Sequence, residues 1–308
     1  MSATIRKLLV CTAFLLIFAS PSVQAKWVKV KTENFFVISE KGEKHATKFA
    51  RDLEDFRRFI VAMNGGRKIG RIPRLPIYMT RDDRKYKKLT GSKKTAGIFK
   101  EGNNGPFAIM YNKKKRGRFD LDGLQVILHE YIHHLNATSQ DVSFPLWYSE
   151  GIAEFLASSR PHKEGMTLGA VLMSRLPALK FEKWYSAEKL MQARRVPKRG
   201  DVFYAQSWLL THMLHFQQNY RPGYNEFANQ ILHGTKPAAA LNAVYGQTFV
   251  DIDAALKAYL KQGKLGYAVV PWTPKEARIL EVIPVTKAEA KLLEKRLAYE
   301  FSSSPLNR

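Results

Sequence analysis

The sequence predicts an α+β protein in which a small mixed sheet with helices forms the N-terminal part and helices form most of the C-terminal part. Before position 113, several short stretches carry the alternating, β-branched and aromatic pattern of strands, and one long stretch carries helical spacing. After position 180, helical spacing recurs in segments that Pro and Gly separate. With 308 residues, the chain is long enough for one large domain or for two closely packed subdomains.

The first 25 residues have the features of a secretory signal peptide. Arg6 and Lys7 precede an apolar run from Leu8 to Ala19, and the segment closes with Pro21 and a V-Q-A ending at Ala25. This run is too short to cross a bilayer comfortably, and no later stretch reaches the roughly 18 apolar residues that a spanning helix needs. We therefore expect an exported protein, periplasmic or secreted, cleaved near Ala25 and without a transmembrane helix in the mature chain.

The first part of the mature chain should combine strands with one long helix. Residues Trp27 to Ile38 indicate one or two strands, and Leu75 to Thr80 indicates another. Two more, Thr95 to Lys100 and Phe107 to Asn112, flank a turn-rich segment. A helix is expected from Glu43 to Met63, with one buried face. That face consists of Ala46, Phe49, Ala50, Leu53, Phe56, Phe59 and Ile60.

The second part of the chain should be mainly helical. Helices are expected at residues 181–194, 202–216, 224–232, 238–245 and 250–262. A last helix is expected from Lys287 to Phe301, in a C-terminal segment that carries no recognisable chemistry.

Residues His129 to His133 read HEYIH and carry the strongest chemical signal in the chain. A helix brings positions four apart onto one face, so His129 and His133 can offer two imidazole nitrogens to one metal ion, and zinc suits such ligands. Glu130 would lie beside the metal, where a carboxylate can take a proton from a zinc-bound water. A catalytic zinc site has three protein ligands and one open position, so a third ligand is expected from a second element.

A second motif, WYSEGIAEF from Trp147 to Phe155, offers that third ligand. Glu150 follows His133 after a turn that contains Pro145, and Glu154 lies one helical turn further on the same face. HEYIH followed by WYSEGIAEF resembles the gluzincin metallopeptidases, the clan of thermolysin and the membrane alanyl aminopeptidases.

The resemblance implies a zincin-like fold and a role for each residue of the two motifs. It implies that His129, His133 and Glu150 are the zinc ligands and that Glu130 is the general base. Glu154 matches a carboxylate that accepts the spare N–H of a ligating histidine and so fixes its tautomer.

A zincin-like fold divides the chain into four parts. These are a signal peptide (1–25), an N-terminal α/β subdomain (26–119), the zinc-site helices with a helical subdomain (120–264), and a C-terminal helical extension (265–308).

Two further elements resemble parts of the gluzincin active site. The strand Phe107 to Asn112 matches the edge strand that pairs with the substrate backbone. It has no acidic residue where the aminopeptidases carry the glutamate of their G-x-M-E-N motif, so an endopeptidase is favoured over an exopeptidase. FYAQSWLLTHML, from Phe203 to Leu214, resembles the element that contributes an oxyanion-stabilising tyrosine, which makes Tyr204 the first candidate and His212 the second. For Tyr204, packing in the core remains an equal alternative.

The remaining histidines near these motifs are expected to be ordinary helix residues. His134 is turned about 100° around the helix from its neighbour His133, so a packing or supporting role is expected for it rather than metal ligation. His212 and His215 are also better explained as packing residues than as catalytic ones.

The chain is strongly basic, with 50 Lys and Arg against 27 Asp and Glu and a formal net charge of +23. For an exported protein, such a charge favours anionic lipid head groups or wall polymers as partners, and makes nucleic acid a weaker alternative. Two basic clusters, residues 113–118 and 194–199, would favour acidic substrates or an anionic surface if they lie beside the active site. Solvated loops are the simpler interpretation of both.

The sequence thus predicts an exported zinc-dependent peptidase that hydrolyses peptide bonds with Glu130 as the general base and peptides or proteins as substrates. The alternative is a zinc-containing but non-hydrolytic envelope protein whose basic surface binds anionic wall or lipid polymers.

Overall fold

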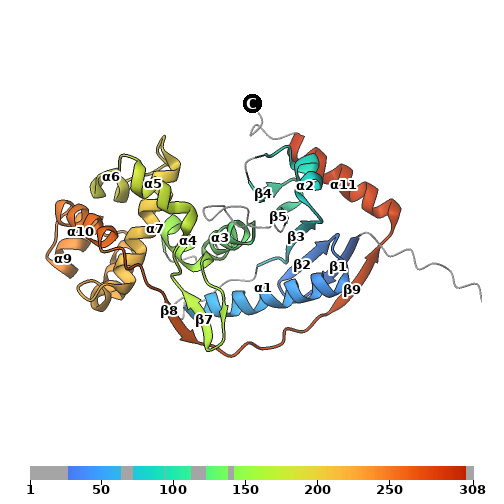
Figure 1. The fold of residues 1–308 in the computed structure, drawn as a ribbon, viewed down its shortest axis with the longest axis horizontal. Helices are drawn as coiled ribbons and strands as arrows, with labels where there is room; N and C mark the ends of the chain where they lie inside the picture. Colours follow the sequence, from blue (N-terminus) through green and yellow to red (C-terminus); the bar gives the residue numbers. More distant parts are fainter. Residues whose placement is uncertain (1–26, 64–71, 94, 112–122, 138–141, 303–308) are drawn as a thin grey trace, which may run out of the picture.

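The structure is a computed structural model that describes residues 27–63, 72–93, 95–111, 123–137 and 142–302. The predicted signal peptide and the basic cluster 113–118 lie outside these residues. No helix in the described part of the chain is long and apolar enough to cross a membrane. The fold is α+β, as predicted, with a mixed sheet and helices on both of its faces (Figure 1).

The main sheet has the strand order β4-β5-β3-β2-β1-β9 in the described residues. Its strands are β1 (Trp27–Lys31), β2 (Phe35–Ser39), β3 (Leu75–Thr80), β4 (Gly97–Gly102), β5 (Gly105–Tyr111) and β9 (Glu281–Val285). β3 runs parallel to both β2 and β5, and the other pairs are antiparallel. The strands expected from the sequence are therefore confirmed between residues 27 and 111, and β9 is an addition from the far end of the chain.

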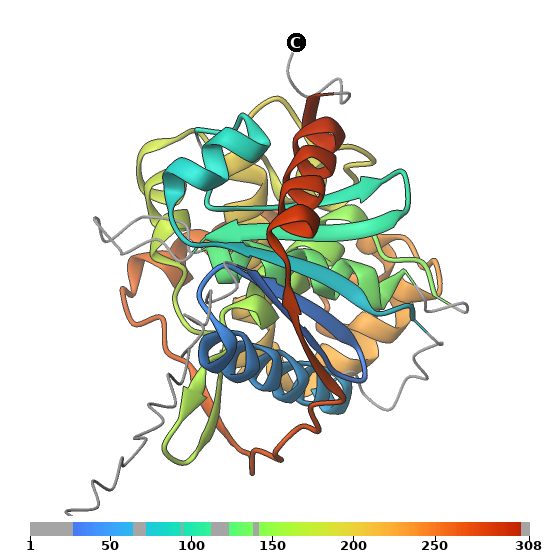
Figure 2. The same ribbon diagram turned by 90° about the vertical axis from the view of Figure 1, so that its right-hand side faces the viewer.

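Alternation along the strands gives the sheet two apolar faces, each covered by helices. One face packs on α1 (Glu43–Met63) and α3 (Gly123–Asn136) through side chains such as Val37, Ile77 and Met110. The predicted buried face of α1 is confirmed residue for residue. The opposite face, with Ile109 and Tyr111, packs on α2 (Asp83–Thr90) and α11 (Lys287–Ser302), which lie side by side in Figure 2.

Helix α2 occupies a charged segment for which the sequence pattern predicted no element. Asp82 caps its first turn by accepting a hydrogen bond from the backbone N–H of Lys85 at 2.8 Å, and Gly91 ends it with φ +71°. Tyr86 and Leu89 are buried among apolar side chains of β5 and α11. Because those partners come from distant parts of the chain, tertiary packing decides this helix more than its own sequence does.

The C-terminal segment joins the two halves of the molecule. Its strand β8 (Ala268–Pro271) pairs with β7 (Gly165–Leu168), which also pairs with β6 (Pro161–His162) in a second, three-stranded sheet. The chain then runs along the lower edge of the view in Figure 1 and enters the main sheet as β9, beside β1. The predicted C-terminal helix is confirmed as α11, whereas these strands and the second sheet were not expected.

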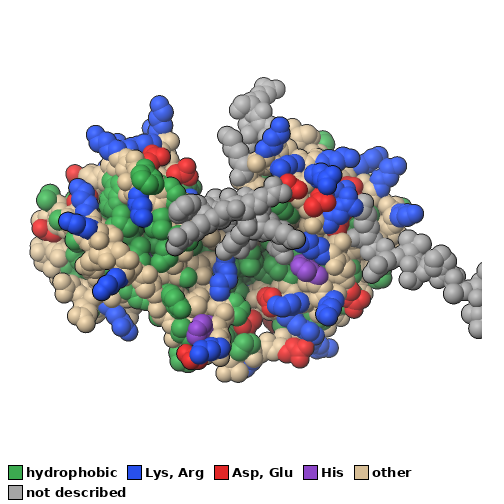
Figure 3. All heavy atoms as spheres, in the orientation of Figure 1, with side chains coloured by type: hydrophobic (Ala, Val, Ile, Leu, Met, Phe, Trp, Pro, Cys, Tyr) green, Lys and Arg blue, Asp and Glu red, His purple; other side chains and the backbone are tan. Residues whose placement is uncertain are grey.

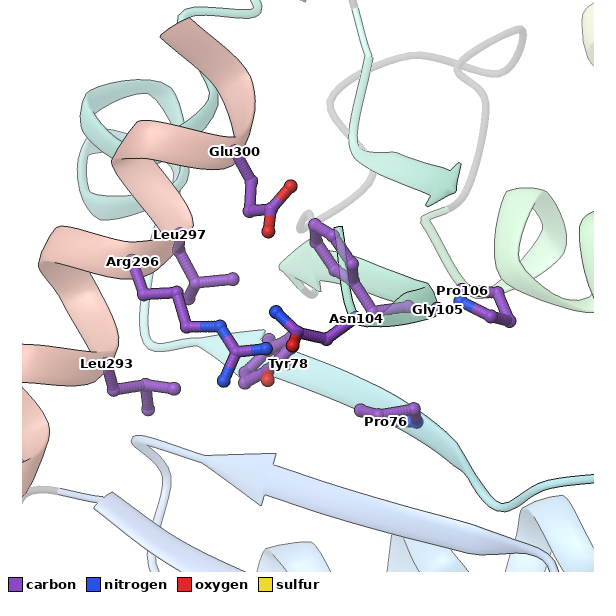
Figure 4. A pocket seen from close by; sticks show the side chains of 10 residues that line it. Pro76, Tyr78, Asn104, Gly105, Pro106, Leu293, Arg296, Leu297 and Glu300 are labelled. Atoms are coloured by element: carbon purple, nitrogen blue, oxygen red, sulfur yellow. The ribbon is translucent and has the colours of Figure 1, made fainter. Parts of the chain in front are cut away.

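Helix α11 holds the tip of the β4–β5 hairpin in place. The carboxylate of Glu300 accepts a hydrogen bond from the backbone N–H of Asn103 at 3.3 Å, and the ring of Phe301 meets that of Phe107 edge-on at 5.9 Å. The space left between the helix and the hairpin is about 40 Å³, in which Arg296 and Glu300 point toward the hairpin (Figure 4). A volume of this size suits one or two waters, so this contact is structural.

The remaining helices form the second half of the molecule around a large apolar core. They are α4 (Leu146–Ala157), α5 (Leu176–Phe181), α6 (Ala187–Met191), α7 (Gly200–Phe216), α8 (Tyr224–Leu232), α9 (Pro237–Tyr245) and α10 (Phe249–Lys261), with short 3₁₀ turns at Met173–Arg175 and Arg221–Gly223. The predicted helices at 202–216, 224–232, 238–245 and 250–262 are confirmed.

The prediction of one helix at residues 181–194 is wrong. Helix α5 already ends at Phe181, and the rest of that range contains only the short helix α6. The side chain of Gln206 accepts a hydrogen bond from the backbone N–H of Tyr185 and donates one to its carbonyl oxygen, both at 2.9 Å. This buried amide holds the backbone before α6 in a non-helical conformation. Ser186 then starts α6 by capping the N–H of Lys189.

Helices α4 and α7 approach each other unusually closely at Gly151. A Cβ atom at this position would lie 2.5 Å from the carbonyl oxygen of Ser207 and would also collide with the hydroxyl of Thr211. The glycine that follows Glu150 in the second motif is therefore required by packing, since it lets α4 rest directly on the backbone of α7.

We expect Gly151→Ala to lower the free energy of unfolding by about 1–3 kcal/mol, because the added methyl group forces the two helices apart. Urea denaturation followed by circular dichroism measures the change. Gly266→Ala is the matched control, since a Cβ there meets no atom within 4 Å. Equal stability of the two variants would contradict the close packing described here.

Candidate metal centre

The two motifs lie on α3 and α4, and close backbone contacts fix where α3 begins. A Cβ at Gly123 would lie 2.6 Å from the carbonyl oxygen of Ala96 and 2.9 Å from that of Tyr111. A Cβ at Gly97 would lie 2.8 Å from the carbonyl oxygen of Gly123. The first turn of α3 thus rests directly on the chain at the start of β4 and the end of β5, which sets the position of the histidines further along the helix.

Three side-chain atoms from α3 and α4 converge on one point. His129 Nε2 and His133 Nε2 are 3.1 Å apart, and each lies 3.1 Å from Glu150 Oε2. Glu150 is buried, and the two histidines are partly buried. Among the described residues, this is the group of His, Cys, Asp and Glu side chains that could hold a metal ion. The structure therefore brings together the three side chains that the sequence indicated as candidate metal ligands.

The geometry of this triangle fits a small divalent metal. In a tetrahedral site with bonds of about 2.0–2.1 Å, neighbouring ligand atoms lie roughly 3.3–3.4 Å apart, close to the spacing seen here. Without a metal, an Nε2–H of these rings can donate to Glu150 Oε2, whereas a bound metal would require the ring hydrogen on Nδ1 and the Nε2 lone pairs directed at the ion.

Oxygen atoms lie behind both histidine rings, within hydrogen-bond distance for His133 and at ion-pair distance for His129. Ser149 Oγ lies 3.1 Å from His133 Nδ1, and Glu154 Oε1 lies 3.5 Å from His129 Nδ1. Arg175, from the 3₁₀ turn after β7, forms a buried ion pair with the same oxygen of Glu154. Such outer contacts fix ring tautomers and raise the basicity of ligating nitrogens.

The surroundings keep the carboxylate of Glu150 ionised. Burial acts to raise its pKa, but hydrogen bonds to His129 and His133 outweigh burial and lower it to about 2. For His129, burial acts to lower the pKa, but the bond to Glu150 and the negative charges of Glu154 and Glu130 outweigh it and raise the pKa. The cluster therefore has an excess of negative charge that a metal cation would neutralise.

Glu130 and Tyr204 lie beside the cluster. The charge of Glu130 acts on both His129 and Tyr204, and the ring of Tyr204, from the second turn of α7, lies 6.3 Å from that of His129. Burial and the charges of Glu150 and Glu130 raise the pKa of Tyr204 to about 12. Its phenol therefore keeps its proton at neutral pH and can donate a hydrogen bond.

Sequence reasoning missed two residues of this site. Ser149 directly precedes Glu150 in the second motif, so its position beside a ligand was a signal that could have been used. Arg175 is an isolated basic residue 21 positions after Glu154, and nothing in the local pattern marks it. Its guanidinium also lies 5.2 Å from the ring of Tyr204, so it contacts both a supporting carboxylate and the candidate oxyanion donor.

The structure excludes the second candidate for the oxyanion donor, His212. Its ring is fully buried, and Nε2 donates to the carbonyl oxygens of Gly169 and Gly266, both at 2.9 Å. Nδ1 accepts a hydrogen bond from the hydroxyl of Tyr259 at 2.7 Å. Because both nitrogens are used within the core, His212 is a packing residue.

The packing roles expected for His134 and His215 are confirmed. The ring of His134 lies among Phe99 and Tyr131, at centroid distances of 6.1 and 6.3 Å. The ring of His215 stacks on Phe155 at 4.3 Å, and its Nδ1–H donates to the carbonyl oxygen of Thr211 at 2.7 Å.

The strand assigned to substrate pairing also needs correction. Residues 107–111 belong to β5, which is hydrogen-bonded to β3 on one side and to β4 on the other. It therefore has no free edge along this length. The edge strand of the sheet on this side is β4, which pairs with β5 alone among the described residues and packs against α3.

Comparison with known proteins adds no relative from which a function could be transferred. No protein-family model matches the chain, and no curated protein matches it. The arrangement of the site residues therefore carries the functional argument.

The buried histidines make the fold sensitive to acid. Burial lowers the pKa of both His212 and His215 to about 4, below the value of about 6.5 of an exposed histidine. The unfolded chain thus binds protons first, and stability should fall as the pH drops from about 6.5 to 4, by up to about 3 kcal/mol for each histidine.

We expect His215→Phe to flatten this decline, because phenylalanine keeps the stacking on Phe155 and does not titrate. Urea unfolding of both proteins across this pH range measures the difference in their free energies of unfolding. Titrating groups that both proteins share contribute equally, so their effects cancel in this difference. Parallel curves for variant and wild type would show that His215 does not carry a depressed pKa.

Proposed function

We propose that the protein is an exported zinc-dependent peptidase of gluzincin type that hydrolyses internal peptide bonds. The observation that carries the proposal is the convergence of His129, His133 and Glu150 on one point with Glu130 and Tyr204 beside it. Two histidines and one carboxylate are a ligand set typical of hydrolytic zinc sites, which leave one coordination position open.

A zinc ion bound by these three ligands would supply a Lewis acid and lower the pKa of a water in the open position. Glu130 takes the proton from the attacking water and later delivers it to the leaving amine. Its place next to His129 on α3 supports this role, because the carboxylate lies beside the ligands without belonging to the triangle that they form.

Tyr204 donates its hydroxyl hydrogen to the oxygen of the attacked carbonyl as negative charge develops there. The raised pKa of Tyr204 supports this role, since the phenol stays protonated throughout the working pH range. The neighbouring guanidinium of Arg175 adds positive charge on the same side of the site. One well-aimed donor of this kind lowers a reaction barrier by a few kcal/mol.

The outer edge of β4 supports binding of an extended peptide. Its backbone N–H and C=O groups on that side have no strand partner among the described residues, and the strand packs against α3. A substrate that pairs with such an edge lies in extended conformation and needs no free terminus, which favours an endopeptidase.

Replacing the general base tests the mechanism directly. We expect Glu130→Gln to lower kcat on a peptide library by at least about a hundredfold, because the amide cannot accept the proton, while bound zinc stays at the wild-type level. Activity assays and metal analysis on the same preparations measure both quantities. Hydrolysis at the wild-type rate with one zinc bound would rule out the role of Glu130.

Replacing the oxyanion donor should change catalysis without changing substrate binding. We expect Tyr204→Phe to lower kcat by about 10- to 1,000-fold with little change in KM, because the hydrogen bond forms only as charge develops. Tyr267→Phe, at an exposed tyrosine, is the matched control. An unchanged kcat in Tyr204→Phe would leave the tyrosine a packing role only.

The contact behind His129 should contribute to metal affinity. We expect Glu154→Gln to weaken zinc binding by about 10- to 100-fold, because the neutral amide no longer orients and polarises the imidazole. Competition with a chromophoric chelator measures the affinity. Glu164→Gln, in the exposed turn between β6 and β7, should bind zinc like the wild type. Equal affinities in both variants would argue against this supporting contact.

A second candidate function is binding of anionic wall or lipid polymers. The observation that favours it is the mostly exposed basic loop 194–199 between α6 and α7. A Cβ at Gly200 would lie 3.5 Å from Val196 and 3.8 Å from Tyr204, so this loop adjoins the part of α7 that carries Tyr204. Elsewhere, Lys and Arg are scattered over both halves of the face seen in Figure 3. If the purified protein binds such polymers but, when loaded with zinc, cleaves no peptide, that result would support this second function.

A further inference from the structure

Phe181 is the most exposed large apolar side chain in the described part of the chain, with 84% of its surface accessible. It is the last residue of α5, in which Ala178 and Leu179 are packed in the core at 7% and 4% exposure. Directly after the helix, at Glu182, the backbone becomes extended. Phe181 therefore lies at a corner of the helical half of the molecule, with its ring in solvent.

Contacts within the chain hold this corner in place. The indole N–H of Trp184 donates a hydrogen bond to the carbonyl oxygen of Leu179 at 2.9 Å, and its ring packs against the core of the helical half. The side-chain amide of Gln206 binds the backbone of Tyr185, one residue further along. Because these contacts fix the residues that follow Phe181, a well-held segment presents its ring to solvent.

The basic loop 194–199 lies against the same corner. The guanidinium of Arg199 lies 4.7 Å from the centre of the Tyr185 ring and donates a hydrogen bond to the carbonyl oxygen of Lys183. The backbone N–H of Arg199 donates to the hydroxyl of Tyr185 at 3.0 Å. Residues 180–183 and 194–199 thus form one surface, which we call the α5–α7 surface.

The α5–α7 surface carries positive charge that the protein does not neutralise. Its only acidic residue is Glu182. None of its exposed basic side chains forms an ion pair within the described part of the chain. These side chains are Lys180, Lys183, Arg194, Arg195 and Lys198. In Figure 3, Lys and Arg side chains project from the molecule over the region of α5 and α6.

The combination of positive charge and an exposed aromatic ring selects the partner. A soluble polyanion would neutralise the charges but leave the ring in water, and a second copy of this surface would bring like charges together. An anionic bilayer offers phosphate groups to Lys and Arg and, just beneath them, an apolar layer in which an aromatic ring is stabilised. Val196, which is 39% exposed, adds a second apolar side chain to the same surface.

We propose that the α5–α7 surface docks on a lipid bilayer with anionic head groups, with the ring of Phe181 inserted at the boundary between head groups and acyl chains. The phosphate groups of the lipids bind the lysines beside Phe181 and the basic side chains of the loop 194–199. This proposal rests on the second candidate function, whose partner it narrows to a lipid surface, and it requires no peptide hydrolysis.

Sedimentation of the protein, purified after export, with lipid vesicles tests the proposal. We expect binding to vesicles that contain phosphatidylglycerol to be at least about tenfold tighter than binding to vesicles of phosphatidylcholine alone, because each basic side chain near an anionic surface contributes about fivefold. Added salt should weaken this binding, since it screens the charges. Equal binding to the two kinds of vesicle would overturn the proposal.

A variant of Phe181 distinguishes a bilayer from a soluble polyanion. Phe181→Ala should weaken binding to the phosphatidylglycerol vesicles by about tenfold and leave binding to polyphosphate unchanged, because only the bilayer buries the ring. Val250→Ala, at a side chain of α10 that is 75% exposed, is the control and should bind vesicles like the wild type. Wild-type vesicle binding in Phe181→Ala would overturn the assignment to a lipid surface.

Charge reversal shows whether this surface or the net charge of the protein is responsible. Lys180→Glu combined with Lys183→Glu should weaken vesicle binding by at least about tenfold. Lys291→Glu combined with Lys295→Glu, at exposed positions of α11, changes the net charge equally and should weaken it much less. Equal losses in the two double variants would overturn the assignment to the α5–α7 surface. Hydrolysis of a soluble peptide by the same preparations tests the peptidase proposal separately, so failure of one proposal is not mistaken for failure of the other.

Discussion

The buried negative charge of Glu150 is the constraint on which the centre of the molecule depends. An isolated carboxylate at this depth would be strongly destabilising, and two imidazole nitrogens at 3.1 Å compensate it. To keep that contact, α4 must lie close to α3 on one side and to α7 on the other. Gly151 permits the approach of α4 to α7, and Gly123 lets the first turn of α3 rest on the backbone at Ala96 and Tyr111, because a Cβ at either position would overlap a neighbouring backbone. The candidate metal centre and the packing of the helices are thus parts of the same arrangement.

Much of the fold could be predicted because its signals are local. The apolar residues of α1 repeat at helical spacing over 21 positions, so both its bounds and its buried face follow from the pattern. The proximity of His129, His133 and Glu150 was also predictable, since a helix fixes the relation of His129 to His133 and the short connection limits where Glu150 can lie. For Tyr204, the resemblance of residues 203–214 to a gluzincin element predicted a ring beside this cluster, and the ring does lie near His129.

What could not be predicted depends on contacts between distant residues. Arg175 reaches Glu154 from a short turn that follows strand β7, and no periodic pattern marks such a turn. The edge of the sheet was assigned to β5 because that strand precedes α3 in the sequence, but strand order in a sheet need not follow chain order. The helix expected at 181–194 does not form as one element, because the side-chain amide of Gln206, from α7, binds the backbone of Tyr185.

The path of the C-terminal segment has a consequence for how the protein is made. Synthesis proceeds from the N-terminus, and β1 keeps an unpaired edge until β9, some 250 residues later, has left the ribosome. Until α11 arrives, the apolar residues of α2 and of the β4–β5 hairpin also stay uncovered. An incomplete chain thus presents a bare strand and an apolar surface, the two features that favour aggregation. The last residues to be made therefore complete the part of the fold that begins with the first strand.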